Sequence, residues 1–167
     1  DHLDYHKDFK EYISVKKNFF NDLHNSAFAL TNKDDKNGNV MISNTKAKKI
    51  TYSLKSMADY KCKVIESRLD GMILNIQNHE IWVKIIGEFN AYNLLAIYST
   101  SVELGLDKDQ LLERISVLNP AEGRFHTIRN SENITGIVDY MHTPDAYENV
   151  LSTINSIRTH TEKLIVV

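Results

Sequence analysis

Apolar residues recur at helical spacing near the start of the chain and give way to strand-like runs further on. Between residues 8 and 24 they fall at intervals of three and four, which predicts an amphipathic helix. A strand is expected at residues 26–31, followed by a turn or the start of a short helix at residues 32–35. Asp34 and Asp35 would seed that turn or contact a ribose, and the turn is favoured. Asn37-Gly38 is expected to break the pattern.

The middle of the chain favours strands, because β-branched and aromatic residues concentrate between residues 49 and 86. The turn signals Asp70-Gly71 and Asn78-His79 suggest hairpins, so we expect this section to be antiparallel. The expected strands lie at residues 50–54, 62–69, 72–76 and 81–86.

Two helices are expected after these strands, at residues 90–104 and 108–118, with Gly105 breaking the pattern between them. Pro120 falls between the second helix and the next strand, which opens at residues 123–125. We therefore place a domain boundary at Pro120, which gives domains at residues 1–119 and 120–167.

A junction between a strand and a helix carries several polar side chains. Residues 134–138 are β-branched and almost uncharged, which predicts a short buried strand. Thr143 is a good helix N-cap and Pro144 suits the first helical position, so a helix is expected there. The apolar positions of that helix are Ala146, Val150, Leu151, Ile154 and Ile157.

Asp139, Tyr140 and His142 lie between that strand and that helix. In open α/β sheets ligands bind in the crevice at such junctions, which points to a polar ligand here. Residues 163–167 look like a second buried, parallel strand. A parallel strand needs a return connection, so we expect the chain to be an excised piece of a longer enzyme.

Composition narrows the class of protein. The chain is 42% hydrophobic and 25% charged with a formal net charge of −2, which gives no electrostatic case for binding nucleic acid or an anionic membrane. No apolar run approaches the roughly 18 residues of a membrane span, so no membrane insertion is expected. Cys62 is the single cysteine, which excludes an internal disulfide and fits a reducing cytoplasm.

Lys16 is out of keeping with the first helix, because it belongs to the apolar stripe, whereas Lys17 is turned roughly 100° away. A lysine on a buried face loses its proton more easily, and a neutral amine adds carbon dioxide to become a carbamate. A carbamate would offer oxygen ligands to magnesium. The alternative is that Lys16 snorkels from the edge of the stripe. The stripe consists of Phe9, Tyr12, Ile13, Phe20 and Leu23.

Each of the other candidate binding residues could instead have an ordinary structural role. His2 and His6 are four apart and would share a helix face as metal ligands, or they are surface and capping residues. Asn90 and Asn93 lie one turn apart, and a carboxamide matches an adenine edge because it both donates and accepts. They would otherwise be a cap and a surface residue. Arg124 would clamp a phosphate bidentately or lie solvated at the surface.

Taken in order, six motifs resemble the Mur ligase family, ATP-dependent enzymes that form amide bonds in peptidoglycan synthesis. The resemblance covers essentially the whole chain, and residues 142–146 resemble the branch that adds the third amino acid. Met141 is a departure, since a small residue is commoner there. The motifs are Asp1-His2-Leu3-Asp4-Tyr5-His6, Lys16, Thr31-Asn32-Lys33-Asp34-Asp35, Gly87-Glu88-Phe89-Asn90-Ala91-Tyr92-Asn93, Gly123-Arg124 and Asp139-Tyr140-Met141-His142-Thr143-Pro144-Asp145-Ala146.

The resemblance implies a fold and a set of site residues. The implied fold is α/β: the second half of the central ATPase domain, a mixed sheet with helices and antiparallel hairpins, followed by the first βα elements of a Rossmann-like C-terminal domain. It implies that Lys16 is carbamylated and holds a magnesium ion together with His2. The residues implied for the nucleotide are Asn93 at the adenine, Arg124 and Asp139, with Tyr140 and His142 in the same loop.

The resemblance also implies a reaction that uses ATP and Mg²⁺. ATP phosphorylates the carboxylate of a UDP-MurNAc-dipeptide, and the amine of meso-diaminopimelate or L-lysine attacks the acyl phosphate. The sequence contains no G-x-x-x-x-G-K-[ST] phosphate loop, so the chain by itself is expected to be inactive. Two alternatives stay open: another branch, such as a folylpolyglutamate synthase, or a non-catalytic homologue that acts as a binding subunit.

Overall fold

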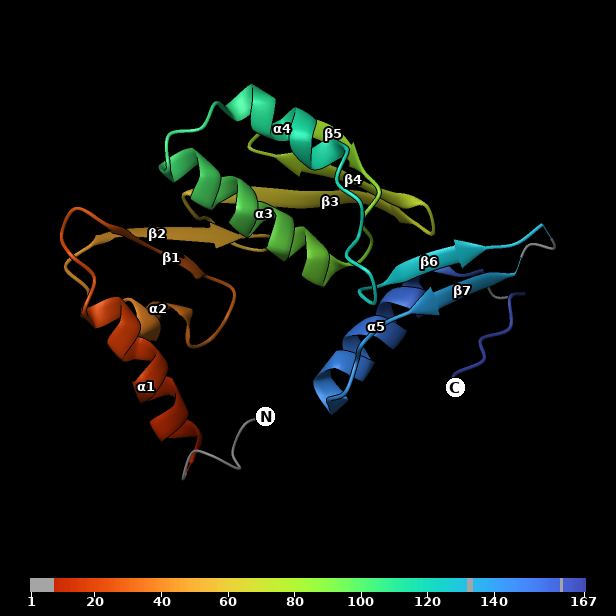
Figure 1. The fold of residues 1–167 in the computed structure, drawn as a ribbon, viewed down its shortest axis with the longest axis horizontal. Helices are drawn as coiled ribbons and strands as arrows, with labels where there is room; N and C mark the ends of the chain where they lie inside the picture. The colour runs from red at the N-terminus through yellow and green to blue at the C-terminus, as the bar shows by residue number, and fades with distance from the viewer. Residues whose placement is uncertain (1–7, 132–133, 160) are drawn as a thin grey trace.

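The computed structural model describes residues 8–131, 134–159 and 161–167 as an α/β fold (Figure 1). Helices pack on a mixed sheet, and a smaller unit follows at the C-terminal end, which confirms the expected fold class. In chain order the elements are α1 (Phe9–Asn21), β1 (Phe28–Asn32), α2 (Gly38–Met41), β2 (Lys48–Ser53), β3 (Tyr60–Arg68), β4 (Gly71–Ile76), β5 (His79–Val83), α3 (Glu88–Glu103), α4 (Lys108–Ser116), β6 (His126–Arg129), β7 (Thr135–Val138) and α5 (Pro144–Ile157).

The main sheet has five strands in the order β1-β2-β3-β4-β5. The expected hairpins are confirmed, since β3, β4 and β5 pair antiparallel. The expectation that the whole section is antiparallel is wrong, because β2 runs parallel to both β1 and β3. Only Tyr52–Tyr60 and Ser53–Lys61 pair between β2 and β3. The two strands are therefore staggered end to end, so a short loop replaces the full crossover that a parallel pair usually needs.

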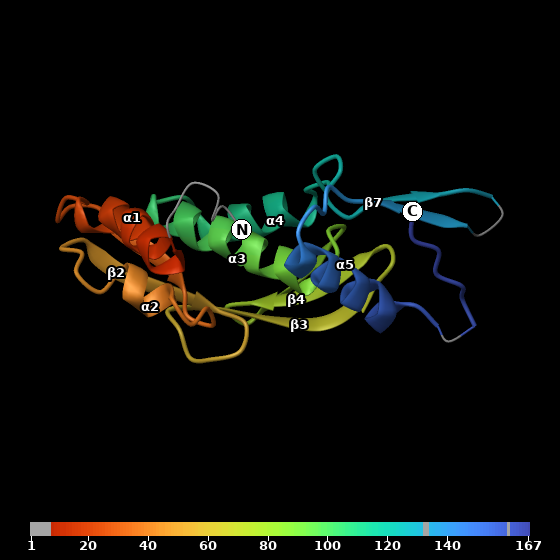
Figure 2. The ribbon, with the colours of Figure 1, turned by 90° about the horizontal axis from the view of Figure 1, so that it is seen from below.

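One face of the sheet is covered by α3 and α4 (Figure 2). The apolar stripe of α3 is buried against the strands through Ala91, Leu94, Leu95 and Tyr98. Cys62 lies in the same core, and burial raises the pKa of its thiol to about 12, so it is a packing residue rather than a reactive one. This core fixes the position of α3, which carries two of the candidate site residues.

A carboxylate ties the parallel part of the sheet to α3. Asp34, in the turn after β1, accepts hydrogen bonds from Ser53 Oγ at 2.7 Å, Leu54 N at 2.9 Å, Ser56 Oγ at 2.9 Å and Tyr92 Oη at 2.9 Å. Burial raises the pKa of Asp34, but the hydrogen bonds from Ser53, Tyr92 and Ser56 outweigh it, so the net pKa is lowered. The expectation that Asp34 belongs to a turn is confirmed.

The first helix is shorter than expected and largely exposed. Asp8 caps it by accepting from Glu11 N at 2.8 Å, but none of its residues is buried. The expectation that Lys16 lies on a buried face is wrong: Lys16 is exposed, and Lys17 is half-buried. The reason is that α1 packs through its C-terminal end, where Phe20 and neighbouring residues meet a small core, while the rest extends away from the sheet (Figure 1).

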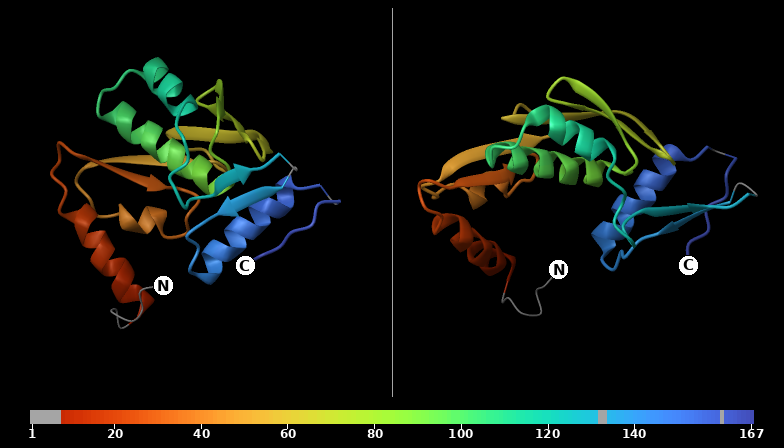
Figure 3. Two further views of the ribbon diagram at one scale, coloured as in Figure 1. Left: turned by 45° about the vertical axis from the view of Figure 1, so that its right-hand side comes forward. Right: turned by 45° about the horizontal axis from the view of Figure 1, so that its top comes forward.

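The C-terminal unit pairs β6 with β7 in antiparallel fashion and packs α5 beside them (Figure 3). The predicted start of α5 is confirmed, because Thr143 Oγ1 accepts from Ala146 N at 3.2 Å and Pro144 occupies the first turn. Ile86, Phe125, Val150 and Ile154 form a separate buried cluster. Since Ile86 comes from the segment before α3, this cluster attaches the C-terminal unit to the end of the main sheet.

The two strands expected at this end have different outcomes. The strand predicted at residues 134–138 is confirmed as β7, but the expectation that it is buried is wrong: β7 pairs only with β6 among the described residues, and Val138 is 50% exposed. Residues 163–167 form no strand, and Ile165 is 82% exposed. A strand needs a neighbour to accept its backbone hydrogen bonds, and no described strand lies alongside this segment. Within the part of the chain that the structure describes, no helix is long and apolar enough to cross a membrane.

The Asp34 hydrogen bonds give a pH-dependent prediction. Replacing Asp34 with asparagine puts an NH₂ group against several donors, so we expect the free energy of unfolding at pH 7 to fall by about 1.5–3 kcal/mol. Because the folded pKa of Asp34 is lowered, its contribution is present above the unfolded pKa of about 3.9 and is lost as the pH falls. The difference between wild type and Asp34→Asn should therefore shrink at pH 3.

Urea unfolding of both proteins at pH 7 and pH 3 measures this difference. The control is Asp70→Asn, in the exposed turn between β3 and β4, which accepts none of these bonds. Equal unfolding midpoints for Asp34→Asn and wild type at pH 7 would contradict the assignment.

Candidate functional site

A groove of about 470 Å³ lies between α3 and the loop that joins α4 to β6. The groove brings together Asn93 and Arg124, which come from different elements of the chain. Its lining combines apolar with polar side chains, which suits a planar ring that carries polar edges. The apolar lining includes Phe89, Leu94 and Ile97, and the polar lining includes Asn90, Asn93 and Arg124.

The two asparagines of α3 are connected by hydrogen bonds. Helix α3 begins at Glu88, directly after Gly87, whose φ of 101° places it in the left-handed region that favours glycine. Asn90 is therefore inside the first turn, and the expectation that it caps the helix is wrong. Its Nδ2 donates to the Ile86 carbonyl at 2.8 Å, and Asn93 Nδ2 donates to Asn90 Oδ1 at 3.2 Å.

Arg124 sits in a tight turn that Asp139 holds from across the β6–β7 pair. Arg124 N donates to the Ala121 carbonyl at 3.0 Å, and Phe125 has a φ of 47°, which is strained for a residue with a side chain. Asp139 Oδ2 accepts from Phe125 N at 2.8 Å, and Phe125 is only 1% exposed. The buried ring and this bond together hold the turn, so Asp139 positions the backbone that presents Arg124.

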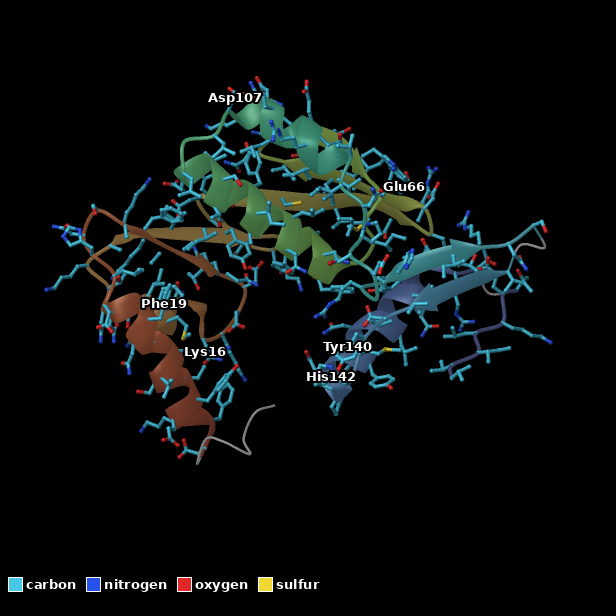
Figure 4. The ribbon with its side chains drawn as sticks, viewed as in Figure 1. Lys16, Phe19, Glu66, Asp107, Tyr140 and His142 are labelled. Carbon is cyan, nitrogen blue, oxygen red and sulfur yellow. The ribbon has the colours of Figure 1, made fainter. Side chains whose placement is uncertain are left out.

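Tyr140 and His142 form an exposed aromatic pair just before α5 (Figure 4). Their ring centroids are 5.3 Å apart, and Tyr140 is 71% exposed. His142 Nδ1 lies 3.1 Å from the Tyr140 carbonyl oxygen, and Tyr140 N donates to the Gly123 carbonyl at 2.8 Å. That second bond ties this loop to the turn that carries Arg124. Four of the predicted residues, Arg124, Asp139, Tyr140 and His142, therefore belong to one connected pair of loops.

Lys16, the one expected metal ligand that the structure describes, is not part of this cluster. Lys16 Nζ lies 4.5 Å from the centroid of the Tyr12 ring, on the exposed side of α1. Figure 4 shows it well apart from Tyr140 and His142. His2, the other expected ligand, lies outside the described residues. Among the residues that are described, no group of three or more His, Cys, Asp or Glu side chains is placed to hold a metal ion.

Sequence reasoning missed part of the groove and all of a second cavity. Phe89 and residues 119–121 line the groove but were not expected to. Phe89 precedes Asn90 directly, so an aromatic residue beside the polar pair was the available signal. The second cavity, of about 640 Å³, is lined by Lys55, Glu88 and one face of α5, and Lys55 pairs with Glu88 at 2.9 Å. Its residues come from distant parts of the chain, so no local pattern could reveal it.

Comparison with known proteins identifies the family. The family model for the Mur ligase middle domain matches residues 1–100. The chain belongs to the Mur ligase family. A relative from Bacteroides thetaiotaomicron, named UDP-N-acetylmuramoyl-L-alanyl-D-glutamate–2,6-diaminopimelate ligase, is 50% identical over 167 residues, which is 100% of this chain and 35% of the relative. The protein of the same name from Phocaeicola vulgatus is 53% identical over 157 residues, covering 94% of this chain and 32% of the relative.

Solved structures of Mur ligases resemble this Mur ligase chain. A structure of a UDP-N-acetylmuramoyl-L-alanyl-D-glutamate–2,6-diaminopimelate ligase is 33% identical, has a TM-score of 0.75, and covers 96% of this chain and 34% of that chain. MurF from Acinetobacter baumannii has a TM-score of 0.83 at 15% identity, covers 94% of this chain and 35% of that chain, and shows the fold alone. The chain spans about a third of the length of the curated relatives it matches.

The bond between Asp139 and Phe125 gives a prediction for this Mur ligase chain. Asp139→Ala removes the acceptor and leaves the Phe125 N–H without a partner, so we expect a loss of about 1–3 kcal/mol in the free energy of unfolding. Asp139→Asn keeps an acceptor oxygen and should lose less. Limited proteolysis should cut Asp139→Ala faster within residues 121–125, and thermal unfolding should show the ranking. Glu148→Ala, which changes an exposed residue of α5, is the control. If Asp139→Ala were cut at the same rate as this control, the claim that Asp139 holds the turn at residues 121–125 would be refuted.

Proposed function

We propose that this Mur ligase chain is part of an ATP-dependent ligase that adds meso-diaminopimelate to UDP-MurNAc-L-Ala-D-Glu in peptidoglycan synthesis. The observation that carries the proposal is the 50% identity, across the whole chain, to relatives named as that ligase. The sequence alone left diaminopimelate and L-lysine open, and the names of the relatives favour diaminopimelate. The proposed location is the cytoplasm, which holds the ATP that the reaction consumes.

The groove beside α3 supports ATP as the nucleotide. Asn93 offers a carboxamide, which matches the donor and acceptor on an adenine edge, and Phe89 offers apolar contact to a flat ring. Arg124 lies in the same groove and would bind phosphate through its guanidinium group. A solved relative, MurF from Thermotoga maritima, is in complex with ADP, although at 15% identity it shows the fold alone.

The proposed reaction joins a carboxylate to an amine through an acyl phosphate. The role of the groove is to position ATP and to offset charge as its terminal phosphoryl group moves to the substrate carboxylate. Asn93 would hold the base, and Arg124 would neutralise phosphate charge. Asp139 would act indirectly, because it holds the turn that presents Arg124. Tyr140 and His142 would face the nucleotide from the loop before α5.

Magnesium is implied by the resemblance, and we propose Lys16, as a carbamate, and His2 as its ligands. A free lysine ammonium would repel a cation, whereas a carbamate presents the oxygen donors that magnesium prefers. The exposed Lys16 side chain leaves room for the modification, but its exposure removes the argument that burial favours the neutral amine. Among the described residues, no group of His, Cys, Asp or Glu side chains forms a magnesium site. The roles proposed above for Asn93, Arg124 and Asp139 therefore do not depend on the ion.

The role of Lys16 is tested in the complete gene product. Lys16→Ala should abolish most diaminopimelate-dependent phosphate release, because no carbamate can form, and added short carboxylates should restore part of it. Lys17→Ala, which changes the next residue of the same helix, is the matched control and should keep most activity. A binding subunit without catalysis would show no phosphate release in any variant, and equal activity of Lys16→Ala and Lys17→Ala would contradict the carbamate.

A second experiment uses the chain of residues 1–167 alone. Incubated with ATP, UDP-MurNAc-L-Ala-D-Glu and diaminopimelate, it should release no phosphate above background, because its sequence has no phosphate loop. Clear turnover by this chain would show that the phosphates are held in some other way.

A further inference from the structure

The hydrogen bonds around Asn90 have a fixed direction. The Ile86 carbonyl can only accept, so Asn90 must turn its NH₂ group toward it, and the two atoms lie 2.8 Å apart. Asn90 Oδ1 then points away from Ile86 and accepts from Asn93 Nδ2 at 3.2 Å. Asn93 must in turn direct its NH₂ group at Asn90. Among the described residues Asn93 Oδ1 has no protein partner, so it remains available as an acceptor at the groove.

We call the hydrogen-bonded series Ile86, Asn90 and Asn93 the relay. Its first member, Ile86, is held in place by packing. Ile86 is 2% exposed and belongs to the buried cluster that attaches the C-terminal unit to the main sheet. Gly87 follows with a φ of 101°, and a Cβ there would lie 2.7 Å from the Phe89 ring, so the backbone at this point is closely confined. Asn93, in contrast, is exposed, and without Asn90 nothing in the described chain would choose between the two orientations of its amide.

We propose that Asn90 is a positioning residue that fixes the amide orientation of Asn93 and thereby makes the groove select a 6-amino purine over a 6-oxo purine. This inference rests on the proposed function, since it takes a purine nucleotide as the ligand of the groove. With Oδ1 of Asn93 facing the base, the exocyclic amine of adenine donates to it. A 6-oxo purine presents an oxygen at that position, so two acceptors would face each other.

In this proposal, discrimination between the two purines requires both asparagines. A single exposed asparagine can rotate its amide by 180° and present its NH₂ group to a carbonyl oxygen, so it would accept both purines. Loss of Asn90 should therefore lower discrimination rather than abolish binding. The expected change in the preference for ATP over ITP, which carries a 6-oxo purine, is roughly tenfold, about the worth of one hydrogen bond.

The experiment measures ATP and ITP in parallel with the complete gene product, as dissociation constants and as kcat/KM for phosphate release. The variants are Asn90→Leu, which has similar size and no hydrogen bonds, and Asn90→Asp, which keeps an acceptor for Asn93. Asn44→Leu, in an exposed loop away from the groove, is the matched control. The ratio of the two nucleotides is the readout, because a partly unfolded variant loses both activities equally and leaves the ratio unchanged.

We expect wild type and Asn44→Leu to prefer ATP, Asn90→Leu to lose most of that preference while still binding nucleotide, and Asn90→Asp to keep more of it. An unchanged ratio in Asn90→Leu overturns the role of Asn90, as does a wild type that binds both purines equally. If Asn90→Leu does not fold, Asn90→Ser takes its place, because the shorter serine side chain cannot reach both the Ile86 carbonyl and the Asn93 amide. The same change in the ratio of ATP to ITP is then expected, and an unchanged ratio overturns the role of Asn90. A wild type that binds neither nucleotide overturns the proposed function itself, and the inference with it.

Discussion

The hydrogen bond from Phe125 N–H to the Asp139 carboxylate is the constraint on which the candidate site depends. It holds a residue with a strained φ of 47° at the turn that presents Arg124, and it does so from the loop that carries Tyr140 and His142. The buried ring of Phe125 fixes the same turn from the other side, because it packs with Ile86 and α5. One carboxylate therefore fixes the turn that presents Arg124, and the Phe125 ring, which packs against Ile86 and Phe89, places that turn relative to α3.

The other half of the groove is set by the core of the main sheet. Burial of Ala91, Leu94, Leu95 and Tyr98 against the strands fixes which face of α3 points outward, and Asn93 lies on that outward face. The contact of Tyr92 with Asp34 ties the same helix to the turn after β1. The proposed recognition of the base by Asn93 and of phosphate by Arg124 would thus come from two units, which are joined through the cluster around Ile86.

The sequence predicted most elements, because local signals determine them. Thr143 and Pro144 specify the start of α5, and the turn residues near Gly71 and Asn78 specify the hairpins, although the second turn lies at Gln77-Asn78, one position earlier than expected. Periodicity could not show whether an apolar stripe finds a partner. For this reason the stripe of α1 was expected to be buried, yet Phe9, a member of that stripe, is 49% exposed and no residue of the helix is buried. The parallel pairing of β2 with β3 also depends on a stagger that no local pattern encodes.

The site residues were predicted by resemblance to a family. The structure adds two contacts that the resemblance did not imply: Asn90 donates a hydrogen bond to the Ile86 carbonyl, and Asp139 accepts one from Phe125 N in the turn that presents Arg124. The most direct test of the nucleotide groove is photochemical labelling of the complete gene product with an adenine nucleotide that carries an azide on the base, followed by peptide mapping. Label that is competed by ATP should appear in the peptides covering residues 85–97 and 118–124. Label confined to other peptides, or label that ATP does not compete, would contradict the account.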